Sequence, residues 1–301
     1  MRIAVTGATG RLGSAVLDAI GSRAGATGIG WSRADFDLDD PASAAASLDR
    51  DQPDLVVHCA AWTDVDACAR EPELALHRNG RATGVLAASC SERGVGLAAV
   101  STNEVFDGLR ADGHGYLPTD ATEPRNPYGR SKLAGELAAR EAFAATGAAS
   151  LWIVRTAWLF GGPGRDFPAK IAEAARNAAA SGSPLRLVAD EFGNPTRVGD
   201  LASGIVDLVH DPAFAGTHHV VNDGWASRAD WARRVLDELG LDVATEDVPL
   251  STWTRDSEPP AWGVLAPTAL PTIGLLRTWA AALREDLAAR PRPDAAPAAA
   301  G

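Results

Sequence analysis

The sequence predicts an α/β protein in which a doubly wound parallel sheet is followed by a smaller α/β lobe. Three observations lead to this prediction. In the first half of the 301-residue chain, short apolar runs alternate with longer helical segments, as in parallel sheets that helices cover on both faces. A glycine-rich turn joins the first apolar run to the first helical segment. The second half continues with helices and short strands in a less regular order.

Each element is located by its apolar run or by its helical periodicity. In the first half, strands are expected at residues 2–6, 27–31, 55–59, 95–101 and 150–156. Helices are expected from the glycine turn to about residue 20 and at residues 72–93 and 127–145. In the second half, helices are expected near residues 167–181, 200–209 and 227–239, and strands near residues 185–188 and 218–221.

The composition excludes several classes of protein. It is 46% hydrophobic and 22% charged, as in ordinary globular proteins, and its net charge of −11 argues against a nucleic-acid surface. The chain begins directly with a strand and has no apolar stretch long enough for a bilayer, so no signal peptide and no membrane partner are expected. Three cysteines without zinc spacing indicate no metal site and fit a reducing cytoplasm. We expect His218–His219 to be structural or on the surface.

The glycine turn at residues 6–13, Thr-Gly-Ala-Thr-Gly-Arg-Leu-Gly, lies between the first strand and the first helix. Gly7 allows the tight turn, Gly10 lets the backbone approach a pyrophosphate, and Gly13 permits close packing of helix on strand. The helix N-terminus then supplies amide donors to phosphates. A turn that merely needs glycine is the alternative, but motif, strand and helix coincide. The residues assigned to a dinucleotide cofactor are Gly7, Thr9, Gly10, Arg11, Leu12 and Gly13.

The end of the second strand bears on the choice of nicotinamide cofactor. NAD-selective sites usually place a carboxylate about 20 residues past the glycines, whereas this chain has Ser32 and Arg33 there. A hydroxyl and a guanidinium suit a 2′-phosphate, so we expect NADPH, with NADH as the alternative. Arg33 could equally be a solvated surface residue. Asp37 and Leu38 follow where a loop can touch the adenine.

Tyr128 and Lys132 share one face of the expected helix at residues 127–145 because they are four positions apart. An ammonium beside a phenol favours the phenolate, so such a tyrosine can exchange a proton with a substrate oxygen near neutral pH. The other tyrosine, Tyr116, has no such partner. A Ser-Thr pair that ends with Thr102 closes the preceding strand.

Together these motifs resemble the extended short-chain dehydrogenase/reductases and, within them, the dTDP-4-dehydrorhamnose reductase family. The resemblance covers about residues 1–240, thins after Ser251, and implies a Rossmann-type fold. Besides the glycine turn, it rests on residues 60–66 (Ala-Ala-Trp-Thr-Asp-Val-Asp), residues 71–75 with Asn79, residues 101–108 (Ser-Thr-Asn-Glu-Val-Phe-Asp-Gly), residues 126–136 around Tyr128, residues 155–158 and residues 190–196.

The resemblance implies hydride transfer from NADPH or NADH to the C4 ketone of a nucleotide-linked 4-keto-6-deoxy sugar. Tyr128 would protonate the alkoxide, Lys132 would lower the tyrosine's pKa and hold the nicotinamide ribose, and Thr102 would orient the carbonyl. To the cofactor the resemblance further assigns Ala60, Ala61, Trp62, Thr63, Tyr128 and Lys132. To the substrate it assigns Thr102, Asn103, Glu104, Tyr128 and Trp158.

These assignments divide the chain into three parts. Residues 1–160 are expected to form the NAD(P)-binding Rossmann domain, to which some later segments return. Residues 161–289 are expected to form mainly the substrate-binding lobe. Residues 290–301 are rich in Pro and Ala and are expected to be a disordered tail. A monomer or a homodimer is expected.

Two departures from the family pattern leave the substrate open. Asn103-Glu104 replaces an Asp-Tyr pair beside Thr102, and Trp253 and Trp262 are unusual in the C-terminal lobe. We expect Asn103 to tune sugar specificity. Trp158 lies at the sugar or in the core. One rival function is a catalytically silent NADP-binding regulatory subunit, like that of methionine adenosyltransferase, although the intact Thr102, Tyr128 and Lys132 weigh against it. Other rivals are a sugar epimerase and a ketoreductase for a non-sugar natural product.

Overall fold

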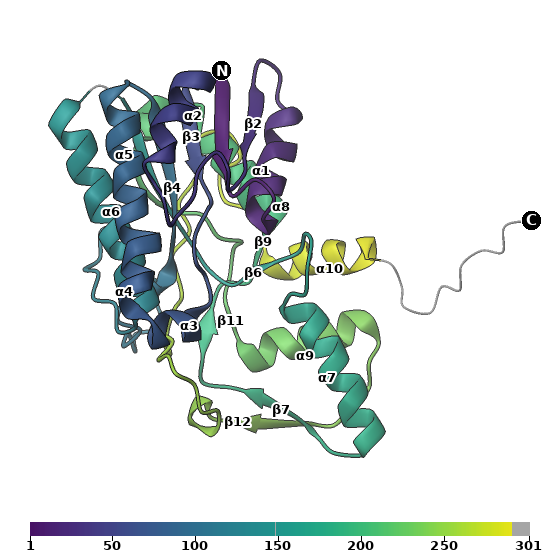
Figure 1. Cartoon of the computed structure of the whole chain (residues 1–301). Coiled ribbons are helices and arrows are strands. Elements are labelled where there is room, and N and C mark those ends of the chain that lie inside the picture. Colours follow the sequence, from purple (N-terminus) through teal and green to yellow (C-terminus); the bar gives the residue numbers. More distant parts are fainter. Residues whose placement is uncertain (148, 291–301) are drawn as a thin grey trace, which may run out of the picture.

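A six-stranded parallel sheet forms the centre of the computed structural model, which describes residues 1–147 and 149–290. Across the sheet the strand order is β10-β5-β4-β3-β1-β2 (Figure 1). The order reverses between β1 and β3, which is the point where open α/β sheets form a ligand crevice. The strand bounds are β1 Arg2–Thr6, β2 Thr27–Trp31, β3 Leu55–His58, β4 Gly96–Thr102, β5 Leu151–Thr156 and β10 Gly216–His219.

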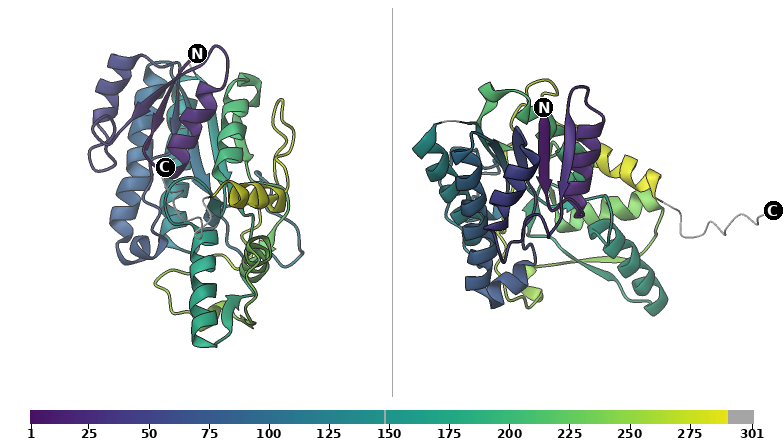
Figure 2. Two further views of the ribbon diagram at one scale, coloured as in Figure 1. Left: turned by 90° about the vertical axis from the view of Figure 1, so that its right-hand side faces the viewer. Right: turned by 45° about the horizontal axis from the view of Figure 1, so that its top comes forward.

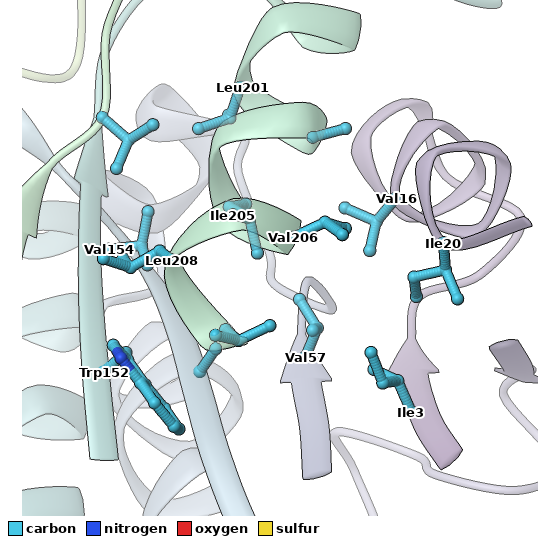
Figure 3. Packing of buried hydrophobic residues seen from close by; sticks show 14 of the residues in the cluster. Ile3, Val16, Ile20, Val57, Trp152, Val154, Leu201, Ile205, Val206 and Leu208 are labelled. Atoms are coloured by element: carbon cyan, nitrogen blue, oxygen red, sulfur yellow. The ribbon is translucent and has the colours of Figure 1, made fainter. Parts of the chain in front are cut away.

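Helices cover both faces of the sheet, because successive strand residues point to opposite sides and both sides are apolar. One face carries α1 Arg11–Gly21 and α8 Val198–Val209, and Figure 3 shows Val16, Ile20 and Ile205 packing over Ile3 and Val57. The other face carries α2 Ser43–Asp51, α5 Ala82–Glu92 and α6 Pro127–Thr146. Figure 2 shows these two layers on either side of the sheet.

Short helices connect β3 to the second layer. They are α3 Val65–Arg70, α4 Pro72–Ala75 and the π-helical turn η1 Leu76–Arg81, which leads directly into α5. This run packs closely against α6. At Gly135 there is no room for a side chain, because a Cβ there would lie 2.6 Å from the carbonyl oxygen of Asn79. Asn126 begins α6 by accepting a hydrogen bond from the backbone N–H of Gly129, and Gly147 ends α6 in the left-handed conformation.

The second half of the chain builds a smaller lobe below the carboxyl edge of the sheet (Figure 1). Its helices are α7 Phe167–Ser181, α9 Arg228–Leu239 and α10 Trp279–Ala289. Pairs of short strands tie the lobe together. These are β6 Leu159–Phe160 with β9 Thr196–Arg197, β7 Leu185–Val188 with β12 Thr245–Val248, and β8 Phe192–Gly193 with β11 Ala226–Ser227.

The doubly wound parallel sheet expected from the sequence is confirmed, and its first five strands agree with expectation to within one residue. Two elements differ. The continuous helix expected at residues 72–93 is interrupted by the π turn η1, and the strand expected near residues 218–221 is β10, two residues earlier. Of the expected tail, residues 291–301 lie outside the described part of the chain. Arg290 does not belong to a tail, because it follows α10 in ion pairs with Asp166 and Asp286.

Candidate active site

The glycine turn forms an open helix N-terminus at the carboxyl end of β1. Gly7 has a φ of 64°, which favours glycine, and a Cβ at Gly13 would lie 2.2 Å from the carbonyl oxygen of Gly7. Gly10 caps α1 without a side-chain hydrogen bond. The first amides of the helix therefore point toward the crevice with the positive end of the helix dipole, as a phosphate site requires. At this turn, the groups that would bind the phosphates of a dinucleotide are backbone amides and not side chains.

A cleft of about 370 Å³ lies beside this turn. Ten of the residues that the sequence assigned to the cofactor line it: Gly7, Thr9, Gly10, Ser32, Arg33, Asp37, Leu38, Ala60, Ala61 and Trp62. Four do not. Arg11 donates a hydrogen bond to the carbonyl oxygen of Gly161, Leu12 is buried in the core, Gly13 packs against Gly7, and Thr63 is exposed. Sequence reasoning missed Phe36, Cys59 and Arg78, which also line the cleft.

A buried histidine joins the glycine turn to the neighbouring loop. His58 is 1% exposed, its Nδ1 lies 2.8 Å from the hydroxyl of Thr6, and its Nε2 lies 3.1 Å from the hydroxyl of Thr83. Thr6 also accepts a hydrogen bond from the N–H of Ala60. Burial, together with a smaller contribution from the nearby Lys132 ammonium, lowers the pKa of His58 to about 3. The imidazole is therefore neutral and acts as a fixed spacer between the two walls of the cleft.

Asn79, on the π turn, holds the wall formed by Trp62. Its side-chain oxygen accepts a hydrogen bond from the N–H of Trp62 at 2.8 Å, and its NH₂ group donates to the carbonyl oxygen of Trp62 at 2.9 Å. The same NH₂ group donates to Ser131 on α6 at 3.1 Å. Asn79 thus links the cofactor cleft to the helix that carries Tyr128 and Lys132. Single π turns within helices are frequent at functional sites.

Tyr128, Lys132 and Thr102 come together where β4 ends and α6 begins. The Thr102 side chain lies near enough to the Tyr128 hydroxyl to lower the pKa of that phenol. Lys132 lies behind the cleft, where its charge acts on His58 and Cys59. All three are largely buried, and Tyr128 packs with Cys68 and the Trp62 wall. The structure therefore brings the expected catalytic residues together beside the cofactor cleft.

The expectation that Lys132 lowers the pKa of Tyr128 is wrong for this structure. Burial raises the pKa of Tyr128, and the nearby Glu104 carboxylate raises it further, while contact with Thr102 opposes both. Burial also lowers the pKa of Lys132 to about 8, and Glu136 acts in the opposite direction. Desolvation penalises both charged forms, so the phenol keeps its proton. A protonated phenol is the form that a proton donor needs.

The two residues after Thr102 point in different directions. Asn103 is buried, donates a hydrogen bond to the carbonyl oxygen of Gly263 at 3.0 Å, and accepts one from the Thr102 hydroxyl at 3.3 Å. Its polar ends are thus engaged within the protein. Glu104 lies against the first turn of α6, where a Cβ at Gly129 would approach its carbonyl oxygen to 2.0 Å. Of the two residues, Glu104 carries a charge, and this charge raises the pKa of Tyr128.

Glu104 is a carboxyl group without an ion-pair partner among the residues that the structure describes. The amide of Asn126 donates a hydrogen bond to its Oε2 at 2.6 Å. The pKa of Glu104 is raised to about 7, chiefly by burial and also by the charge of Glu191, although the Asn126 hydrogen bond and the charges of Arg255 and Arg228 act in the opposite direction. The group therefore changes charge near neutral pH beside Tyr128.

We expect Glu104→Gln to stabilise the protein at pH 8 but not at pH 4.5 or below. The unfolded carboxyl loses its proton near pH 4.5 and the folded one near pH 7, so the parent loses stability as the pH rises through this window. Removing the charge should recover on the order of 1–3 kcal/mol at pH 8. Urea unfolding at both pH values measures the change. Glu258→Gln is the control because that side chain is 77% exposed, and an equal gain at both pH values would contradict the prediction.

Trp158 is held in an unusual backbone conformation at the end of β5. Its φ of 44° is a genuine outlier for a bulky side chain. The guanidinium of Arg228 lies 3.6 Å from its ring centroid, and the ring of Trp231 stacks on that of Trp158 with the two centroids 5.6 Å apart. A Cβ at Gly193 would meet the ring at 2.5 Å. These contacts fix a half-buried aromatic wall on the lobe side of Thr102 and its strand.

Two acidic residues of the 60–66 segment and the two neighbouring histidines lie outside the cofactor cleft. Asp64 caps α3, and Asp66 accepts a hydrogen bond from the hydroxyl of Ser257 in the lobe. His218 and His219 are both buried within β10; the His218 ring contacts the carbonyl oxygen of Phe214, and the ring nitrogens of His219 have no hydrogen-bond partner among the described residues. Within residues 1–147 and 149–290, no group of three or more His, Cys, Asp or Glu side chains is arranged to hold a metal ion, and no helix is long and apolar enough to cross a membrane. A second hollow of about 460 Å³ lies under the loop that contains Trp253.

Comparison with known proteins gives consistent matches. The sequence matches the family described as RmlD substrate binding domain over residues 1–290. A dTDP-4-dehydrorhamnose reductase of Mycobacterium tuberculosis is 36% identical over 294 residues, which cover 96% of this chain and 93% of that protein. A solved dTDP-4-dehydrorhamnose reductase from Clostridium acetobutylicum has a TM-score of 0.86 and 28% identity, covering 96% of this chain and 99% of that one. The corresponding Bacillus anthracis structure, in complex with NADP, has a TM-score of 0.84 and 27% identity, covering 95% and 98%.

Proposed function

This chain belongs to the RmlD substrate-binding-domain family, and from that premise we propose that it is an NADPH-dependent reductase of a nucleotide-linked 4-keto-6-deoxy sugar. The observation that carries the proposal is the meeting of Thr102, Tyr128 and Lys132 beside the cleft of the glycine turn. A silent binding subunit has no use for a buried, protonated phenol next to a nicotinamide site. The intact group therefore favours the enzyme.

Each residue has a role that follows from its chemistry. The nicotinamide cofactor supplies the hydride when it is bound, with the amides of the glycine turn on its phosphates. Tyr128 donates the proton that converts the substrate's C4 alkoxide to an alcohol. Thr102 donates a hydrogen bond to the carbonyl oxygen. The ammonium of Lys132 stabilises the phenolate that forms when Tyr128 gives up its proton. Oxidised cofactor and the 4-hydroxy sugar are the products.

We assign the sugar and its nucleotide to the side of the cleft formed by the lobe, at residues 161–289. The Trp158 wall and the Glu104 carboxyl border this side, and Asn103 is proposed to act on specificity through the position of Thr102. A monomer or a homodimer in the cytoplasm completes the proposal. Three free thiols, Cys59, Cys68 and Cys90, support that compartment.

The proposal is tested by NADPH consumption against a panel of nucleotide-linked 4-keto-6-deoxy sugars. We expect consumption with at least one dTDP-linked member, slower consumption when the nucleotide is UDP, and a product that contains two additional hydrogen atoms by mass spectrometry. NADH should be a poorer reductant at equal concentration. Tight NADPH binding without consumption on any member would overturn the enzyme assignment and favour the silent subunit.

A further inference from the structure

The cofactor cleft contains two arginines that share one carboxylate. Arg78 binds Asp39 through two guanidinium nitrogens, with Nε 2.6 Å from Oδ1 and Nη2 2.8 Å from Oδ2. Arg33 reaches the same Oδ2 at 2.9 Å. Arg33 comes from the turn after β2, whereas Arg78 comes from the π turn η1. Both arginines line the cleft, and Asp39 is not among the lining residues. The glycine turn by itself requires none of these three.

The two arginines differ in how firmly they are held. The guanidinium of Arg78 stacks over the Trp62 ring at 5.2 Å from its centroid, and its side chain is 25% exposed. The next residue, Asn79, fixes the Trp62 backbone through two hydrogen bonds. The Arg33 side chain is 72% exposed and also contacts Asp37. Arg78 is therefore the preorganised cation of the pair, because stacking and burial restrict it to one place.

Asp39 behaves as an anion bound between two cations. Its pKa is lowered chiefly by the hydrogen bonds from Arg78 and further by the charges of Arg78 and Arg33. A phosphate dianion offers more acceptor oxygens and more charge to two guanidiniums than one carboxylate does. The arrangement around Asp39 is thus the arrangement that a phosphate on the adenosine ribose requires, at the strand end where that ribose lies in dinucleotide sites.

We propose that Arg33 and Arg78 together clamp the 2′-phosphate of NADPH and that Asp39 is an internal competitor for the same clamp. The proposal rests on the nicotinamide cofactor of the proposed function. NADPH binding breaks the contact of Asp39 with at least one arginine, whereas NADH leaves these ion pairs intact. Arg78, which no motif in the sequence identifies, then decides cofactor preference together with Arg33.

The test is the affinity of the full chain for NADPH and for NADH without substrate, measured by titration calorimetry. Arg78→Ala should weaken NADPH binding about 10-fold, near the lower end of the range for one charge-assisted contact, and change NADH binding less than about twofold. Arg33→Ala should have a smaller effect in the same direction because its side chain is more exposed. Asp39→Asn should strengthen NADPH binding several-fold and leave NADH unchanged.

Arg93→Ala is the matched control, because Arg93 forms a similar pair with Asp49 at 2.7 Å and is not among the residues that line the cleft. It should leave both affinities unchanged. Arg78→Lys keeps the charge without the paired geometry and should lose less NADPH affinity than Arg78→Ala. Equal weakening of both cofactors by both Arg78 variants would overturn the clamp and make Arg78 a support for Trp62. Weaker NADH binding by Asp39→Asn would also overturn it, because Asp39 would then hold the ribose hydroxyl. Absence of binding of either cofactor to the parent protein would instead refute the proposed function.

Discussion

Tyr128→Phe is expected to lower turnover by ~10²–10⁴-fold while NADPH still binds with nearly the parent's affinity. The substitution removes only the phenolic oxygen, which carries the transferable proton and contacts Thr102. The ring remains to pack with Cys68 and Trp62, so the wall of the cofactor cleft is preserved. Initial rates of NADPH oxidation give the turnover, and titration calorimetry gives the affinity.

The chain provides a matched control for this experiment in its only other tyrosine, Tyr116. Its hydroxyl donates a hydrogen bond to Asp107 at 2.5 Å, and its ring stacks on Phe106. Tyr116→Phe also removes one buried hydroxyl, but it should cost stability and leave turnover within a few-fold of the parent. A Tyr128→Phe enzyme that works at the parent's rate would show that another group protonates the product.

Glu136→Gln should cost about 3–5 kcal/mol of unfolding free energy, because it leaves a buried guanidinium without its carboxylate. Glu136 accepts hydrogen bonds from Arg155 Nε at 3.0 Å and Nη2 at 2.7 Å, and from the Ser101 hydroxyl at 2.5 Å. Both charged side chains are 3% exposed or less. This pair ties α6 to the ends of β4 and β5, directly before Thr102 and Thr156. Urea unfolding measures the loss.

The exposed pair Arg186–Glu246 is the comparison, with both side chains about half exposed. Glu246→Gln should cost less than about 1 kcal/mol. Replacing both buried partners, as in Glu136→Leu with Arg155→Met, should cost less than Glu136→Gln alone, since no uncompensated charge remains. If the buried and exposed single substitutions were equally mild, the network would not hold the catalytic helix in place.

Local patterns were sufficient for the parts of the site that lie within one segment. The glycine turn could be predicted because strand, glycines and helix are consecutive, and the pairing of Tyr128 with Lys132 follows from helical spacing. The five strands of the first half were also predictable, since a strand buried on both faces is a nearly continuous apolar run. Each of these features requires only neighbours in the sequence.

Features that depend on partners distant in the sequence could not be predicted. The role of Arg78 depends on Asp39, and the engagement of Asn103 depends on Gly263. The pKa of Tyr128 was predicted in the wrong direction because spacing shows that Lys132 is near but not that both groups are desolvated. The π turn η1 leaves no pattern of its own, because helix periodicity continues on both sides of it.

The strand order has a consequence for the synthesis of the chain on the ribosome. β10 pairs with β5 at the edge of the sheet, and α8 together with Leu270 and Leu276 covers the apolar side of α1 and β1. When only the first 160 residues have emerged, β5 is an unpaired edge and this apolar face is bare, which is a surface that invites aggregation. The nucleotide-binding half therefore cannot finish folding as an independent N-terminal unit. It must wait for α8 and β10, which are translated between the first and the later elements of the lobe, and for the segment with Leu270 and Leu276, which is translated later still.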